Sequence, residues 1–196
     1  MGQEGGGGKR SWIGGAAAVV LTLMASGCTD GGQGNDAAGD ADAVSGAAAG
    51  APQYLPKIPV LIRHGEGVSD TRLSIELAAE PGQQEKGLMH RTDLDRGEGM
   101  LFPMLPPRMP SFWMKDTPTS LDLVFIRPDG GVAKIVARAK PDDPTPLFAD
   151  VPVAGVLELR GGDAASFGLD EGDRVSWGAC TQGGKEVAVA ADNFCP

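Results

Sequence analysis

The sequence predicts a mainly β fold, a compact antiparallel barrel- or sandwich-like domain with two short helices. Apolar and polar residues alternate over several short segments, which is the period of a half-buried strand. A Pro-Asp-Gly-Gly turn at residues 128–131 separates two of these segments and is a hairpin signal. Hairpin signals outnumber the long helical crossovers that a parallel sheet requires, so we expect mostly antiparallel pairing.

The predicted strands are short, and turn residues separate each from the next. They are rich in Val, Leu, Ile and Phe, which suit a pleated and partly buried surface. We expect about six or seven strands. The clearest segments are residues 73–77, 100–102, 121–127, 132–138, 154–159 and 175–177.

Two short helices interrupt the strands. Pro81 suits the first turn of a helix, where its missing N–H has no partner to lose, and Gly87 can end that helix in a left-handed cap. Asp163 is a candidate N-cap for a second helix over residues 164–167. Four prolines within residues 103–110 predict an irregular loop there.

The chain has 196 residues, which is enough for one ordinary domain with appendages. Most residues before Ala51 are Gly, Ala, Asp and Ser, which offer little surface to bury. His64 falls within the predicted tether and is expected to be solvated. We predict a signal peptide at 1–27, a flexible tether at 28–68, the β-rich domain at 69–178 and a C-terminal tail at 179–196.

The formal net charge is −9 and the sequence pI is about 4.6. An acidic chain without Lys/Arg clusters repels nucleic-acid phosphates, so we expect no nucleic-acid partner. The same charge disfavours loose adhesion to anionic lipids. Any attachment to a membrane must therefore be covalent or use an inserted segment.

The amino terminus carries the features of a secretion signal. Lys9 and Arg10 precede an apolar stretch, residues 13–24, that is too short to span a bilayer. Residues 25–28, Ala-Ser-Gly-Cys, then resemble a bacterial lipobox, although Ala25 stands where leucine is usual. The resemblance implies cleavage before Cys28 and lipidation of that cysteine, which anchors the chain to a bacterial membrane facing the periplasm or the cell surface. The alternative is an ordinary secretory signal that leaves Cys28 free.

The two remaining cysteines, Cys180 and Cys195, lie in the predicted tail. In an oxidising compartment we expect them to form a disulfide. The alternative is a Cys–His nucleophile pair with His90. The aromatic rings are few and are expected to carry much of the core, namely Phe102, Phe112, Trp113, Phe125, Phe148, Phe167 and Trp177.

The stretch from Ser111 to Ile126 holds the densest set of candidate binding residues. Phe112, Trp113 and Met114 form an apolar patch beside a polar triplet. Charged side chains next to an aromatic face could hold a polar ring such as a sugar. The alternative is a hydrogen-bond network that only orders a corner. The candidate ligand-binding residues are Arg91, Trp113, Lys115, Asp116, Thr117, Asp122 and Glu158.

Four motifs together resemble one family. They are Gly-Leu-Met-His-Arg at 87–91, Gly-Met-Leu-Phe at 99–102, Ser-Phe-Trp-Met-Lys-Asp-Thr at 111–117 with Leu-Asp at 121–122, and Val-Leu-Glu-Leu at 156–159 with the glycines that follow. This pattern is similar to the domain-of-unknown-function 192 family over residues 71–178. Asp116 departs from the family's usual asparagine, and His90 departs from its usual aromatic residue. The resemblance implies a compact β fold and an envelope or secreted setting, with no settled activity.

The leading hypothesis is a non-catalytic, lipid-anchored envelope protein that binds a small polar ligand or a partner protein. One rival is an envelope saccharide hydrolase that uses Asp116, Asp122 or Glu158. Another is a copper-handling protein, with Met104 and Met109 free to reach the metal. Only two histidines are present, so a zinc site has little support, and we expect no cofactor.

Overall fold

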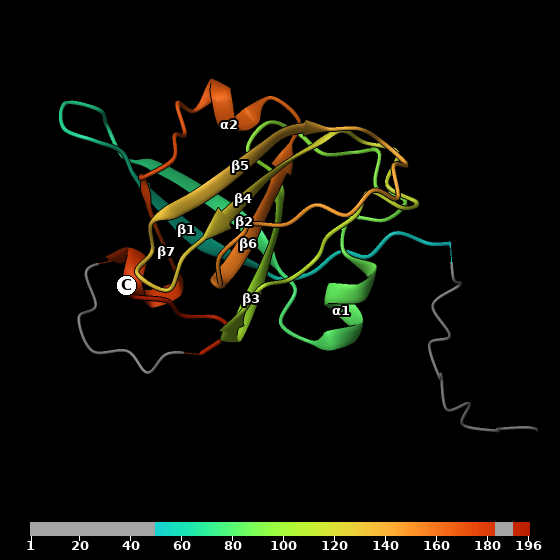
Figure 1. Ribbon diagram of the computed structural model, residues 1–196, viewed down its shortest axis with the longest axis horizontal. Helices are drawn as coiled ribbons and strands as arrows, with labels where there is room; N and C mark the ends of the chain where they lie inside the picture. The colour runs from blue at the N-terminus through green and yellow to red at the C-terminus, as the bar shows by residue number, and fades with distance from the viewer. Residues whose placement is uncertain (1–49, 183–189) are drawn as a thin grey trace, which may run out of the picture. The chain divides into compact units, whose positions relative to one another are not determined.

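The computed structural model describes residues 50–182 and 190–196; Cys28 and the predicted signal peptide lie outside them. Seven strands form one sheet in the spatial order β5-β4-β6-β3-β2-β1-β7 (Figure 1). The predicted mainly β class is confirmed. The strands are β1 (Lys57–Arg63), β2 (Thr71–Leu77), β3 (Gly99–Arg108), β4 (Leu121–Ile126), β5 (Val132–Ala139), β6 (Val153–Arg160) and β7 (Arg174–Trp177). The helices are α1 (Pro81–Lys86), α2 (Asp163–Ser166) and the 3-10 helix η1 (Gly178–Gln182).

The sheet curls into a half-barrel. Every neighbouring pair is antiparallel except β2 and β3, which run parallel. The two edge strands, β5 and β7, approach each other at one end. There the N–H of Val132 donates to the Asp173 carbonyl (2.7 Å) and the N–H of Val175 donates to the Gly130 carbonyl (2.8 Å). These bonds cover backbone groups at the edges that would otherwise be open to pairing with another chain.

Apolar side chains pack on both faces of the sheet. One cluster includes Ile75, Leu101, Val124, Leu157 and Trp177. The other, which we call the α1-side cluster, includes Leu88, Met100, Phe102, Met104, Met114, Leu121, Leu123, Phe125 and Val156. Because successive strand residues point to opposite faces, neighbouring residues of β3, β4 and β6 enter different clusters.

Asp122, on β4, holds α2 in place. Its side chain is fully buried, and Oδ1 accepts the N–H of Arg138 (2.7 Å). Its Oδ2 accepts the N–H groups of Gly162 and Ala164, both at 2.9 Å. The predicted N-cap is Asp163, whereas the observed N-cap is Gly162 at a left-handed φ of 94°. The Asp122 carboxylate, from a distant strand, supplies the acceptor.

The domain begins earlier than predicted. Residues 57–63 lie within the predicted tether, but they form β1, which pairs with both β2 and β7. Pro59 interrupts the apolar alternation there and obscures the strand pattern. His64 is also not solvated, since its side chain is 2% exposed and its ring nitrogens lie 2.8 Å from Asp173 Oδ2 and 2.9 Å from Thr71 Oγ1.

The end of the chain packs on the domain rather than extending from it as a separate tail. Phe194 is buried and stacks on Trp177, with ring centroids 4.3 Å apart, and the backbones of the two residues exchange hydrogen bonds. The predicted Cys180–Cys195 disulfide is confirmed. It closes a loop of sequence separation 15 beside this contact.

Two further predictions need correction. Residues 103–108 are not a loop, because β3 continues through them to Arg108 with a shift of register against β6. Proline is tolerated where a strand leaves its regular ladder. Trp113 and Phe148 are not core rings, since they are 53% and 48% exposed. No helix in the described ranges is long and apolar enough to cross a membrane.

The buried hydrogen bonds of Asp122 predict a large effect of its removal. We expect Asp122→Ala to lower the free energy of unfolding by about 3 kcal/mol or more, because buried N–H groups lose a charged acceptor. Urea unfolding would measure this, with Asp150→Ala at an exposed position as the matched control. Equal stability of the two variants would contradict the assigned role of Asp122.

Candidate functional site

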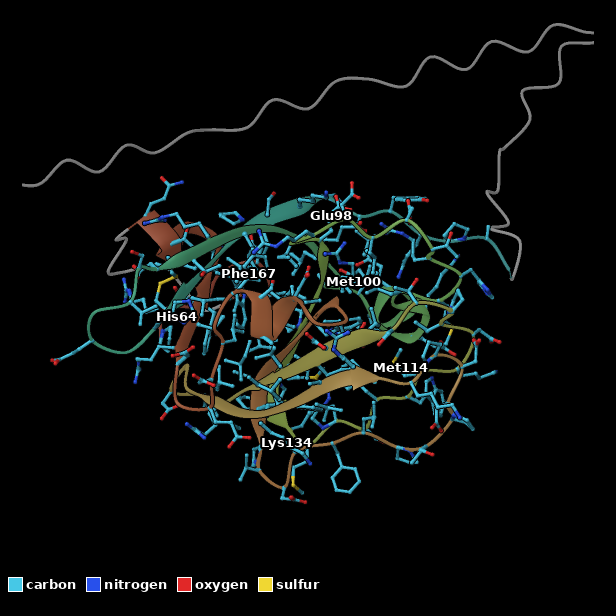
Figure 2. The ribbon with its side chains drawn as sticks, turned by 90° about the horizontal axis from the view of Figure 1, so that it is seen from above. His64, Glu98, Met100, Met114, Lys134 and Phe167 are labelled. Carbon is cyan, nitrogen blue, oxygen red and sulfur yellow. A yellow bond between two sulfur atoms is a disulfide. The ribbon has the colours of Figure 1, made fainter. Side chains whose placement is uncertain are left out.

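A cavity of about 240 Å³ lies beside α1, and we call it the Glu158 cavity. Glu158 enters it from β6, and Thr117 and Trp113 enter from the loop before β4. Met100 and Met114, both in the adjoining α1-side cluster, lie on one side of the domain, and His64 lies on the opposite side (Figure 2). The lining residues used below are Glu85, Lys86, Met89, Phe102, Met104, Arg108, Phe112, Trp113, Thr117 and Glu158.

Glu158 is a buried acid among apolar neighbours. It is 5% exposed and lies opposite Met100 on β3 and Leu123 on β4. Within the residues that the structure describes, no hydrogen bond or ion pair reaches its carboxyl group. Burial raises the pKa of Glu158 to about 8, because the charged form loses its hydration. The group is therefore mostly protonated at neutral pH and offers both a donor and an acceptor to the cavity.

The close approach of β3 to β6 positions Glu158. Gly99 lies opposite Leu159 in the antiparallel ladder. A Cβ atom at Gly99 would overlap the backbone carbonyl of Glu158, so only glycine allows this spacing. The glycine in the Gly-Met-Leu-Phe motif thus allows β3 and β6 to pair at the position from which Glu158 enters the cavity.

The rim of the cavity carries positive and negative groups. Lys86 ends α1, and its ammonium group has no hydrogen-bond or ion-pair partner in the described part of the chain. Arg108 ends β3 and donates to the Gln84 side-chain carbonyl at 3.3 Å. Gln84 is itself held by donating to the carbonyls of Ala78 and Pro103. Glu85 also lines the cavity but is exposed on the surface of α1.

Aromatic rings form one wall. Phe112 packs edge-to-face against Phe102 and Phe125, with centroids 5.2 and 6.3 Å away. Its backbone pairs with Leu147 through two hydrogen bonds of 2.8 Å. This pairing holds Phe112 inward and leaves the next residue, Trp113, half exposed at the mouth.

The structure brings three of the seven predicted ligand-binding residues together in the cavity, namely Trp113, Thr117 and Glu158. Lys115 and Asp116 lie outside it and face each other at 3.8 Å, where both are well exposed. Asp116 adopts a positive φ of 54°, and its carbonyl accepts the N–H of His90. These contacts order a turn.

Arg91 and Asp122 also lie apart from the cavity, each within a satisfied network. Arg91 is 3% exposed, and it pairs with Glu76 at 2.9 Å and with Asp93 at 2.7 Å. Its guanidinium stacks over the Tyr54 ring, 4.2 Å from the centroid. Asp122 occupies the opposite face of the sheet from Glu158, because Leu159 is its cross-strand partner. Asp122 and Glu158 therefore do not form a pair of carboxylates.

Sequence reasoning missed several lining residues. Lys86 and Met89 lie on or after a helix of six residues, which is too short for its periodicity to reveal a face. Arg108 ends a strand that was predicted as a loop. Met104 is 3% exposed rather than free, whereas Met109 is 65% exposed. In the described ranges no three His, Cys, Asp or Glu residues are grouped to hold a metal ion.

Comparisons with known proteins place this geometry in context. A proposed transcription regulator from Sinorhizobium meliloti 1021 is 35% identical, with a TM-score of 0.61 over 65% of this chain and 98% of its own. A protein of unknown function from Novosphingobium aromaticivorans is 41% identical, with a TM-score of 0.60 over 71% of this chain and 100% of its own. No curated protein matched this chain.

A family model matches the part of the chain that contains the cavity. The sequence model of the domain-of-unknown-function 192 (DUF192) family, described as an uncharacterized ACR, matches residues 62–177. This match spans β2 to β7 and includes every lining residue named above. The chain therefore belongs to the domain-of-unknown-function 192 family.

Proposed function

We propose that this protein binds a small polar molecule in the Glu158 cavity and does not transform it. One observation carries the proposal: a buried carboxyl group faces a cavity without a partner in the described part of the chain. Among the described residues no fully buried side-chain oxygen or nitrogen lacks a hydrogen bond, so the Glu158 carboxyl oxygens reach the open space of the cavity. A molecule bound there can hydrogen-bond to them directly, which provides a directed polar contact among apolar walls.

The size and walls of the cavity support a small ligand. About 240 Å³ is below the usual range for drug-sized ligands, so the occupant is a small metabolite rather than a long chain. Phe112 and Trp113 supply flat apolar surface near the mouth. Apolar walls with a few directed polar groups are typical of sites that bind and orient a small molecule.

The arrangement of acids does not favour a saccharide hydrolase. Glycoside hydrolysis ordinarily uses two carboxyl groups that flank one bond. Asp122 is on the other face of the sheet and accepts three backbone N–H groups, and Asp116 does not line the cavity. The second lining carboxylate is Glu85, which is exposed on α1. For these reasons Glu158 is assigned to binding rather than to acid catalysis.

The proposal also includes a location in the cell. We place the β domain outside the cytoplasm, tethered to a bacterial membrane through a lipid on Cys28. The Cys180–Cys195 disulfide supports an oxidising compartment. The net charge of −9 disfavours binding to DNA, so the description of the Sinorhizobium relative is not carried over to this chain.

The lipid anchor can be tested by intact-mass measurement of protein extracted from bacterial membranes. We expect a chain that begins at Cys28 and carries the added mass of a diacylglycerol and a fatty acyl group. A Cys28→Ser variant should appear in the soluble fraction. A mature chain with an unmodified Cys28 would contradict the anchor.

The raised pKa of Glu158 predicts a pH dependence of stability. The native state keeps this proton up to pH about 8, whereas the unfolded chain releases it near the ordinary value of 4.5. Between these values the native state binds more protons, so the free energy of unfolding falls as pH rises. Relative to a Glu158→Gln variant, the wild type should lose about 3 kcal/mol between pH 5 and pH 7.5.

Urea unfolding at several pH values within that window would measure the difference. Glu171→Gln changes an exposed acid and serves as the matched control, whose profile should run parallel to the wild type. If the Glu158→Gln profile is also parallel to the wild type, Glu158 is ionised in the native state and its assigned environment is wrong.

Binding itself can be tested by NMR with four probes added singly at millimolar concentration: methyl α-D-glucoside, N-acetylglucosamine, L-leucine and glycine. We expect at least one probe to shift the backbone amide signals of Leu88, Met89 and Ser111 while leaving Ala165 unchanged. The same shifts should be absent in Glu158→Leu, which replaces the acid by an apolar side chain among apolar neighbours. If no probe produces such shifts, or if Glu158→Leu retains them, the proposed function fails.

A further inference from the structure

We infer that the molecule held in the Glu158 cavity is a zwitterion of amino-acid size, with its ammonium group on Glu158 and its carboxylate directed toward Lys86 and Arg108. This inference rests on the proposed function and names the class of ligand for the same site. Three features of the cavity carry it, namely the buried acceptors, the aromatic wall and the cationic rim.

The buried acceptors match a primary ammonium group in number. An ammonium group has three N–H donors, and the ionised carboxyl group of Glu158 offers two acceptor oxygens. Thr117, whose hydroxyl donates to the Lys115 carbonyl at 3.2 Å, can accept a third bond on its free lone pairs. A sugar would place several hydroxyl groups among thioethers and phenyl rings, which are poor hydrogen-bond partners, and would leave some of them unsatisfied.

The walls favour a cation over a neutral ligand. Phe112 and Trp113 present aromatic rings to the cavity, and the negative face of such a ring attracts a cation. The opposite charge of Glu158 compensates the loss of hydration that a buried ammonium suffers. Met89, Phe102 and Met104 also line the cavity and offer apolar contacts to a side chain between the charged ends.

The rim supplies the complementary charge for the other end of the ligand. Lys86 has no partner in the described ranges, and Arg108 bonds only a neutral amide among them. Glu85 is the single acidic group at the rim, so the lining groups there carry a net charge of +1 from two cations and one anion. A carboxylate at the mouth therefore meets positive charge, while an ammonium group deeper in the cavity meets Glu158.

Binding of the zwitterion is coupled to the release of one proton. The ligand arrives with its ammonium group already protonated, and the Glu158 O–H bond breaks so that its carboxylate can pair with that group. The proton leaves to solvent. Three other charged residues line the cavity with Glu158, namely Glu85, Lys86 and Arg108. Glu76 on β2 lies opposite Met100, which in turn lies opposite Glu158, and Glu76 is already paired with Arg91. The raised pKa of Glu158 means that the released proton comes from this group at neutral pH.

The test is isothermal titration calorimetry with a matched series on the full chain. L-leucine carries both charges, isoamylamine carries only the ammonium group, 4-methylpentanoate carries only the carboxylate, and methyl α-D-glucoside carries neither. We expect L-leucine to bind at least tenfold more tightly than each of the other three. Titrations in phosphate and in Tris, whose ionisation enthalpies differ, should show release of nearly one proton per leucine at pH 7. The affinity for leucine should rise by close to tenfold between pH 6 and pH 7.

Variants separate the two ends of the ligand. Glu158→Gln keeps the shape of the side chain and should weaken leucine binding at least tenfold and abolish proton release. Lys86→Ala and Arg108→Ala should each weaken leucine binding while leaving isoamylamine binding unchanged. Lys115→Ala removes a nearby cation outside the cavity and should change the affinity for neither leucine nor isoamylamine.

Three results would overturn the inference. If methyl α-D-glucoside binds in a Glu158-dependent manner without proton release and leucine does not bind, the ligand class is wrong although the binding function stands. If leucine binds equally well to the wild type and to Glu158→Gln, the carboxyl group does not contact the ammonium group. If no compound of the calorimetry series and no NMR probe binds, the proposed function fails together with the inference.

Discussion

The interior strand β6 is the constraint on which the rest of the structure depends. It pairs with β3 on one edge and with β4 on the other, and seven of its eight residues are buried. Apolar clusters cover both of its faces, so each side chain on it enters a different environment from its neighbour in sequence. A polar residue on such a strand must either find partners within the protein or face a cavity.

Asp122 and Glu158 show both outcomes on adjacent strands. Asp122 faces one side of the sheet, where the backbone N–H groups of Arg138, Gly162 and Ala164 converge on it. Glu158 faces the other side, where the neighbouring strands present Met100 and Leu123. The two acids differ in hydrogen bonding because the two faces of the sheet pack against different elements. The start of α2 donates backbone N–H groups to Asp122, whereas the cavity beside α1 gives Glu158 no donor among the described residues.

The sequence was sufficient for much of the fold because strand alternation is a local property. The period of two residues located β2 and β4 to β7 within a few residues, and Pro81 located the start of α1. The two-residue period did not reveal β1, because Pro59 interrupts the pattern there. The predicted end of β3 came too early, because prolines occupy the second half of that strand. The burial of Phe194 depends on its stacking with Trp177 across the disulfide-closed loop, which no local pattern encodes.

The candidate site was harder to predict than the fold, because a charged residue is available to a ligand only if it has no hydrogen-bond partner within the protein. Asp122 and Glu158 each stand between two leucines in the sequence, and Arg91 stands in a more polar segment between His90 and Thr92. Whether each is satisfied depends on partners far away in the chain, such as Glu76 for Arg91 and Gly162 for Asp122. The register between β3 and β6, which Gly99 permits, is what leaves Glu158 directed into open space. A buried acid becomes a candidate for binding only after the fold has shown that nothing within its reach neutralises it, and that step requires the three-dimensional arrangement of donors.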